Sequence, residues 1–130
     1  MEVNEKISNM KIFKKTTLIS LTLIIISCNN DHKIIRLLQS SEKEDIIYGA
    51  YLAGESNEKK FVPLLLDSAA DPRRSTNLRF LGISIYQSKM GALSKILKKE
   101  PPVKLTRDVD SVIIKFYIDL AKEDSAILKE

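Results

Sequence analysis

The sequence predicts an all-α fold, and three observations lead to this prediction. The 130 residues include only four glycines and no tryptophan, and aliphatic residues carry most of the apolar content. The apolar residues recur at i, i+3, i+4 and i+7, which is the spacing of amphipathic helices, and they rarely alternate as in strands. Similar helix pairs follow each other along the chain. We therefore expect a short α-solenoid of about five helices after a cleaved signal helix, with an irregular helical bundle as the alternative.

The first segment has the organisation of a secretion signal. Three lysines within 11–15 form a positive region, and an apolar run of twelve residues follows over 16–27. That length fits the apolar region of a signal peptide and is shorter than the roughly 20 residues that span a bilayer. Two acidic residues within 1–9 are unusual ahead of such a region, so we expect Met10 to be the true start.

The end of the apolar run resembles a bacterial lipobox. Ile25-Ile26-Ser27-Cys28 supplies an aliphatic residue, a tolerant position, a small residue and the only cysteine. The resemblance implies cleavage after Ser27, a diacylglyceryl group on the Cys28 thiol and acylation of the new amino group. Such chains anchor a protein firmly, because each buried methylene contributes about 0.8 kcal/mol. Asn29 after the cysteine resembles the sorting pattern of outer-membrane lipoproteins, so the resemblance also implies an outer-membrane location.

We divide the chain into three parts. Residues 1–27 form the signal peptide, 28–40 carry the lipidated cysteine and a tether, and 41–130 form the helical domain. The tether includes the short helical stretch KIIRLLQ and the only histidine, His32.

The first helix pair is expected within 41–70. Ser41 and Glu44 fit a capping box, in which each side chain bonds to the other residue's amide. The face of the first helix carries Ile47, Ala50, Tyr51 and Gly54. The face of the second helix carries Phe61, Leu64, Leu65 and Ala69. Pro63 falls in the first turn of that second helix, where its missing N–H costs little.

Three further helices are expected after the Asp71-Pro72 turn. The third begins near Arg73 or Thr76, and its face carries Leu78, Leu81, Gly82 and Ile85. QSKMG at 87–91 is interpreted as a turn, and the fourth helix follows over 92–99, before Pro101-Pro102. The fifth begins near Thr106 or Asp108, and its apolar stripe consists of Val109, Val112, Ile113, Phe116, Tyr117, Leu120 and Ala121.

The helix pairs resemble each other at an offset of thirty-three residues from Gly49 to Gly82 and of thirty-one from Phe61 to Ala92. IIYGAYLAG at 46–54 aligns with LRFLGISIY at 78–86, and FVPLLL at 61–66 aligns with ALSKIL at 92–97. A two-helix unit at this period indicates a solenoid. Gly49 aligns with Gly82, and a missing side chain there would let a neighbouring helix approach closely.

The stretch from IIYGAYLAG through FVPLLL and Asp-Pro-Arg is similar to bacterial HEAT-like repeats. In that family a helix rich in small residues precedes a polar turn, a VPLL helix and an Asp-Pro-Arg connection. The resemblance covers about 43–100. The second unit departs from it, because MGALSKIL lacks the proline and Pro101-Pro102 replaces the tight turn.

No catalytic set emerges from the residue types. Lipidation consumes the only thiol, His32 lies in the expected tether, and no glycine-rich phosphate loop is present. With one cysteine and one histidine, a zinc or similar site lacks its usual ligands. We therefore predict a protein that is not an enzyme and has no metal or cofactor. The net charge of +4, half of it within 1–27, is too small to indicate nucleic acid binding.

The candidate binding residues are cations. Arg73, Arg74 and Arg79 precede Lys89 along the chain, and in a solenoid they would share one surface. A solvated face without binding function is the alternative interpretation of these four.

The leading hypothesis is a lipid-anchored helical module of the cell envelope. It attaches to the membrane through Cys28 and docks a protein partner. The alternative is a binder or inhibitor of an anionic envelope ligand or polymer through the basic face. A third reading, an enzyme family with HEAT-like repeats such as the bilin lyases, lacks an acid/base pair.

Overall fold

The computed structural model describes residues 29–124 and Ile127, and the chain divides into two compact units, Met1–His32 and Lys33–Glu130. Of the first unit only 29–32, which are helical, are described. The predicted start at Met10, the signal peptide, the cleavage position Ser27 and the lipidation position Cys28 lie outside the described residues. The second unit contains the fold and is described below.

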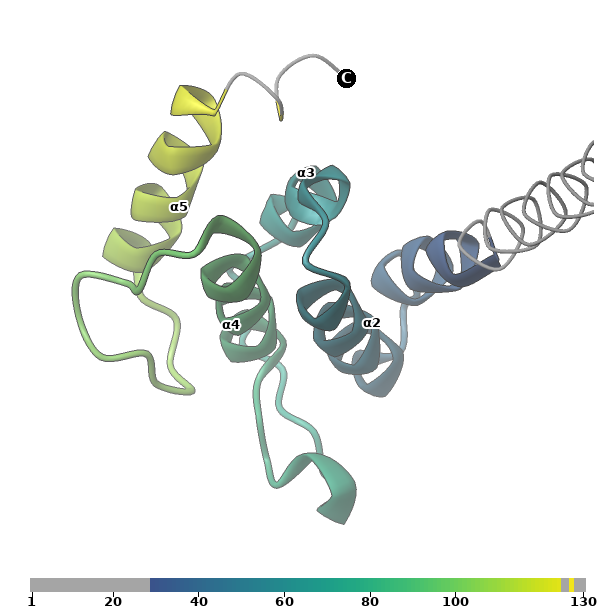
Figure 1. Ribbon diagram of the computed structural model, residues 1–130. Coiled ribbons are helices and arrows are strands. Elements are labelled where there is room, and N and C mark those ends of the chain that lie inside the picture. Colours follow the sequence, from purple (N-terminus) through teal and green to yellow (C-terminus); the bar gives the residue numbers. More distant parts are fainter. Residues whose placement is uncertain (1–28, 125–126, 128–130) are drawn as a thin grey trace, which may run out of the picture. The chain divides into compact units, whose positions relative to one another are not determined.

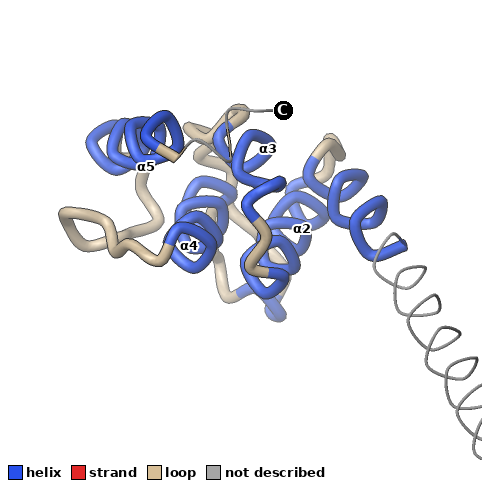
Figure 2. The backbone as a smooth tube through the Cα atoms, turned by 45° about the horizontal axis from the view of Figure 1, so that its top comes forward, coloured by secondary structure: helices blue, strands red, loops and turns tan. Residues whose placement is uncertain are grey.

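The second unit is all-α, which confirms the predicted fold class. It starts in a helix that ends at residue 38, and the described part contains no strand (Figure 2). The elements that follow are α2 (Lys43–Ser56), the 3₁₀ turn η1 (Lys59–Phe61), α3 (Val62–Leu66), the 3₁₀ turn η2 (Leu78–Phe80), α4 (Ile85–Leu97) and α5 (Ser111–Glu123) (Figure 1).

Helix α4 is the element against which α2, α3 and α5 pack. It is buried around most of its circumference, and Tyr86, Met90 and Leu93 are fully covered. The core joins these side chains to residues of every other helix: Ile34, Leu38, Ala50, Ala53, Phe61, Val62, Leu65, Ile113, Tyr117 and Ala121. Because three helices cover α4, it lies at the centre of the domain.

The predicted tether is part of the folded domain. Ile34, Leu37 and Leu38 are at most 9% exposed, and Ile34 and Leu38 belong to the main core cluster. The boundary at residue 41 was therefore wrong, because KIIRLLQ belongs to the second unit and buries its apolar side chains in the core, with Leu37 and Leu38 close to Gly49 of α2.

The predicted third helix was wrong, and the predicted fourth helix is the second half of a helix that begins earlier. Residues 71–84 form a loop with only the η2 turn, and one continuous helix, α4, covers 85–97. The predicted turn at 87–91 lies inside that helix. Ser84 is the N-cap, and its hydroxyl accepts a hydrogen bond from the Gln87 amide at 3.0 Å. This cap fixes the start of α4 at Ile85. The helical spacing of the apolar residues before it had instead predicted a helix that began earlier.

Other local predictions have mixed outcomes. Pro63 lies in the first turn of α3, as expected, but this helix ends at Leu66. The N-cap of α2 is Glu42 and makes no side-chain cap bond, so the Ser41–Glu44 capping box was wrong. Instead, the Ser40 hydroxyl accepts from the Glu42 amide and donates to Asp45. Tyr51, which was assigned to the buried face of α2, is 55% exposed.

Helix α5 begins later than expected. Its N-cap is Asp110, whose carboxylate accepts from the Val112 amide at 2.8 Å. Ile113, Tyr117 and Ala121 form the buried face, whereas Val109 and Val112 are exposed. The Tyr117 hydroxyl donates to the Lys99 carbonyl and connects α5 to the end of α4.

The repeat is not confirmed, because the two aligned glycines occupy different kinds of position. A Cβ atom on Gly49 would lie 2.8 Å from the Leu37 Cβ atom and 3.0 Å from the Leu38 nitrogen, so this glycine permits the close helix contact that was predicted. Gly82 lies in the loop with a φ of +72°. It serves a turn and contacts no neighbouring helix.

None of the described helices combines the length and the hydrophobicity that crossing a membrane requires.

We expect Gly49→Ala to destabilise the domain by about 1–3 kcal/mol, because the added methyl group overlaps the backbone of the preceding helix. Urea unfolding followed by circular dichroism at 222 nm measures the change.

Gly91→Ala is the matched control, since a Cβ atom there meets no atom within 4 Å. Replacing a helical glycine by alanine then stabilises by roughly 0.5–1 kcal/mol. Equal shifts in the two variants would contradict the close packing at Gly49.

Candidate functional site

The described residues enclose a pocket of about 520 Å³ between α2 and α4. One wall comes from α2, the facing wall from α4, and the third from the loop that contains η2. The lining residues are Ile47, Tyr48, Ala50, Tyr51, Gly54, Arg79, Phe80, Leu81, Ile83, Gln87, Ser88, Gly91, Ala92 and Lys95.

Small residues give this pocket its shape. At one end α2 and α4 approach so closely that a Cβ atom on Gly54 would lie 3.2 Å from the Ala92 Cα atom. At the preceding residue of α4, Gly91, no atom lies within 4 Å of the position of a Cβ. The helices are therefore in contact at Gly54, while the surface in front of Gly91 stays open.

The third wall is a braced loop over 71–84. Its two arms are joined by hydrogen bonds from the Ser75 amide to the Ile83 carbonyl and from the Ile85 amide to the Arg73 carbonyl. At its base the Ser84 hydroxyl donates to the Arg107 carbonyl at 2.8 Å. Ile46, Ile47 and Ile85 form a second apolar cluster against which Phe80 and Ile83 pack. Figure 1 shows the loop extending away from the helices.

The tip of this loop exposes two large apolar side chains. Leu78 is 89% exposed and Leu81 is 77% exposed. Leu81 also has a φ of +48°, a left-handed conformation that costs a residue with a Cβ atom about 1–3 kcal/mol. The Leu81 carbonyl accepts from the Arg107 guanidinium at 3.3 Å. Contacts from outside the loop thus support a conformation that presents both leucines to solvent.

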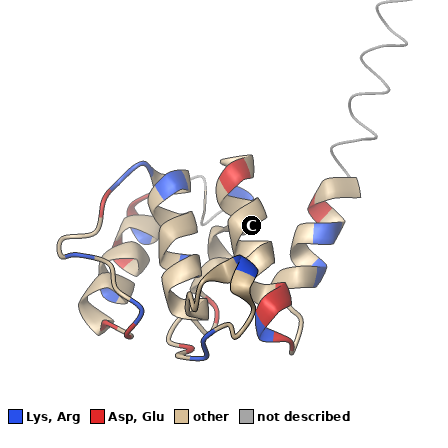
Figure 3. Ribbon diagram, turned by 90° about the horizontal axis from the view of Figure 1, so that it is seen from below, with Lys and Arg blue, Asp and Glu red and all other residues tan. Residues whose placement is uncertain are grey.

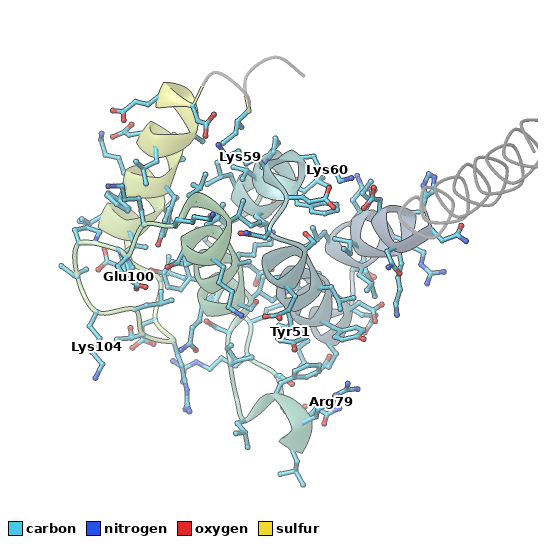
Figure 4. All side chains as sticks on the ribbon, viewed as in Figure 1. Tyr51, Lys59, Lys60, Arg79, Glu100 and Lys104 are labelled. Carbon is cyan, nitrogen blue, oxygen red and sulfur yellow. The ribbon has the colours of Figure 1, made fainter. Side chains whose placement is uncertain are left out.

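Aromatic rings and cations form the rim of the pocket. Tyr48 and Tyr51 lie with ring centroids 6.5 Å apart on α2. The Arg79 guanidinium lies 5.4 Å from the centroid of Tyr48, and the Lys95 ammonium lies 5.8 Å from that of Tyr51. Cations over ring faces at these distances are attracted by the ring quadrupole. Figure 4 shows Tyr51 and Arg79 on the same side of the molecule.

The polar groups of the pocket differ in their partners. Lys95 forms an ion pair with Glu55. Among the described residues no carboxylate lies within ion-pair distance of Arg79. The side-chain oxygen of Gln87 is buried and has no hydrogen-bond partner in the described structure. A buried polar atom without a partner carries a desolvation cost, so this oxygen is a point at which a ligand can gain binding energy.

Three of the four predicted cations serve the fold. Arg73 donates from its guanidinium to both carboxylate oxygens of Asp71 and to the Ser41 carbonyl. Arg74 forms an ion pair with Asp108. Lys89 is 4% exposed, and its ammonium donates to the Asp67 carbonyl at 2.6 Å. Burial lowers the Lys89 pKa.

The structure does not bring the four cations together as one basic surface. Only Arg79 lines the pocket. Figure 3 shows basic and acidic residues interspersed over the described helices and loops.

Sequence reasoning missed Tyr48, Gln87, Gly91 and Lys95 as pocket residues. The last three follow each other at intervals of four on α4 and so share one helix face. The pattern Ser84-x-x-Gln87 is itself a capping-box signature and would have placed all three on one helix.

One further candidate from the sequence, His32, is not among the residues that line the pocket. His32 belongs to the first unit and is exposed. Within the described residues, no three His, Cys, Asp or Glu side chains are grouped as a metal site would require.

Comparison of the chain with protein-family models, with curated proteins and with solved structures gives no match.

We expect Asp71→Asn to weaken the base of the loop by about 1 kcal/mol at pH 7, the upper end for a partly exposed ion pair. The bonds from Arg73 hold the Asp71 pKa below its usual value. The carboxylate therefore stabilises the fold above about pH 4, and this contribution is lost as pH falls through the lowered pKa. Urea unfolding at pH 7 and at pH 3 measures the difference, which should shrink at the lower pH.

Asp119→Asn is the control. Asp119 pairs with Lys115 on the exposed side of α5, and such a pair contributes little to stability. A loss at pH 7 as large as that of Asp71→Asn would contradict a specific role for the Asp71–Arg73 contact.

Proposed function

We propose that the protein is a non-enzymatic, lipid-anchored module of the cell envelope that holds a protein partner at the tip of the 71–84 loop. The observation that carries this proposal is the exposure of Leu78 and Leu81 on a loop whose base is braced by hydrogen bonds. Exposed leucines on an ordered projection gain free energy only when a partner covers them.

The basis for the lipid anchor is the lipobox around Cys28, which follows a positive region and a short apolar run. A domain tethered in this way samples the membrane surface and meets envelope proteins at high local concentration. Docking at the loop tip does not require the HEAT-like repeat, which stays a prediction.

The location of the cations favours this proposal over an anionic polymer bound across a basic face. Arg73 and Arg74 already have acidic partners, and Lys89 is buried. Of the four candidate cations, only Arg79 retains a charge that no carboxylate of the described residues offsets. One such arginine does not make the extended positive surface that a polymer of many negative charges requires.

The first test concerns the anchor. We expect protein extracted from the membranes of its native host to lack residues 1–27 and to carry the added mass of acyl chains. Cys28→Ala should remove this mass and leave the protein unprocessed. Intact-mass spectrometry measures both, and a membrane-extracted chain that retains residues 1–27 without acyl groups would contradict the anchor.

The second test concerns the docking surface. A photo-crosslinking amino acid placed at position 78 in the full chain should form one discrete cross-linked species in the native host. The same amino acid at Lys104, on the loop between α4 and α5, is the control (Figure 4).

Leu81→Asp in the position-78 background should reduce this species about tenfold, because a charge replaces an apolar contact. The thermal unfolding midpoint should not fall, since Leu81 is exposed and aspartate adopts the left-handed conformation more readily than leucine. Equal cross-linking from positions 78 and 104 would contradict docking at the loop tip.

A further inference from the structure

The pocket between α2 and α4 has the size and lining of a small-molecule site. Its volume of about 520 Å³ lies within the range of pockets that hold compact organic ligands. Most of its surface comes from apolar groups, among them Ile47, Phe80 and Ile83. Such a surface favours the apolar body of a ligand.

The positive charge of Arg79 favours a ligand with a negative charge. Its guanidinium lies over the rings of Tyr48 and Phe80, at 5.4 and 5.9 Å from their centroids. These contacts orient the planar group without using its five donors, which suit the two oxygens of a carboxylate. Lys95 across the pocket is already paired with Glu55, so Arg79 is the pocket cation for which the described residues supply no carboxylate.

Gln87 supplies a second polar contact on the α4 wall. Its amide oxygen is buried and lacks a partner in the described structure. A ligand that brings a hydrogen-bond donor to this oxygen relieves the cost of leaving it unpaired. The neighbouring position Gly91 provides the space, because no atom lies within 4 Å of where its Cβ would be.

We propose that this pocket binds a small carboxylate with an apolar body. The carboxylate contacts the Arg79 guanidinium at the rim, and the body lies along Gly91 between α2 and α4. This site goes beyond partner docking at the loop tip and needs no lipid anchor, so either proposal can fail alone.

The test uses 4-phenylbutyrate as the probe and the full chain with labelled isoleucine and leucine methyl groups. Saturable shifts at the methyl groups of Ile47, Leu81 and Ile83 are expected. 4-Phenylbutanol has the same body without the charge, and butyrate has the charge without the aromatic body. Each should bind about tenfold more weakly than 4-phenylbutyrate, because a hydrogen bond to a charged group or the burial of the ring is lost.

Two variants locate the site. Arg79→Glu should weaken 4-phenylbutyrate about tenfold or more and leave 4-phenylbutanol unchanged, whereas the matched reversal Lys104→Glu on a different loop should change neither. Gly91→Leu should fill the pocket and weaken both compounds. Circular dichroism and the thermal midpoint verify that each variant folds. If the Gly91 variant does not fold, the Arg79 variant alone tests the proposal, because Arg79 is exposed and its replacement should not disturb the core.

Every protein chain also ends in a carboxylate. The same binding experiment is therefore repeated with an acetylated tetrapeptide that ends in phenylalanine and with its amidated form. Binding of the peptide acid without binding of 4-phenylbutyrate would overturn the small-molecule proposal and assign the pocket to a peptide terminus. Absence of saturable methyl shifts with 4-phenylbutyrate, or equal affinity in Arg79→Glu, would also overturn it.

Discussion

The close packing of α4 against α2 is the contact on which the rest of the structure depends. Gly54 meets the backbone of Ala92, and a Cβ atom there would lie only 3.2 Å from the Ala92 Cα atom. Once α4 is held there, its remaining faces provide the surface on which α3 and α5 pack. The interior is filled by large side chains of α4, such as Tyr86 and Met90, which are completely covered. Most of the apolar burial that stabilises the domain therefore involves this one helix.

The same crossing gives rise to the pocket. Beside the contact at Gly54, the surface in front of Gly91 stays open, and the loop over 71–84 closes this space between α2 and α4. The loop holds its position because Phe80 and Ile83 pack on the isoleucines of α2 and α4. The Ser84 hydroxyl bonds to the Arg107 carbonyl at its base, and the Arg107 guanidinium bonds to the Leu81 carbonyl near its tip. The left-handed Leu81 is supported by these contacts, and its side chain remains in solvent.

The predictions that depended on the local spacing of apolar residues were confirmed in some segments and wrong in others. The periodicities of α2 and of Ile113, Tyr117 and Ala121 in α5 indicated real helices, because those segments bury one face. The same spacing over 78–85 was misleading. There the Ser84 cap begins α4, and cross-loop hydrogen bonds satisfy the backbone in another way. The spacing of apolar residues indicates which side chains become buried, but it does not indicate which segment of the chain covers them.

By itself the sequence determined the all-helical class, the close approach at Gly49 and the resemblance of the residues around Cys28 to a lipid-attachment signal. These follow from residues a few positions apart, for which helical geometry and side-chain size suffice. Only the tertiary structure decided the single α4, the burial of Lys89 and the pocket beside Arg79. Each depends on segments distant along the chain, whose meeting is set by packing of the whole core and not by any local pattern.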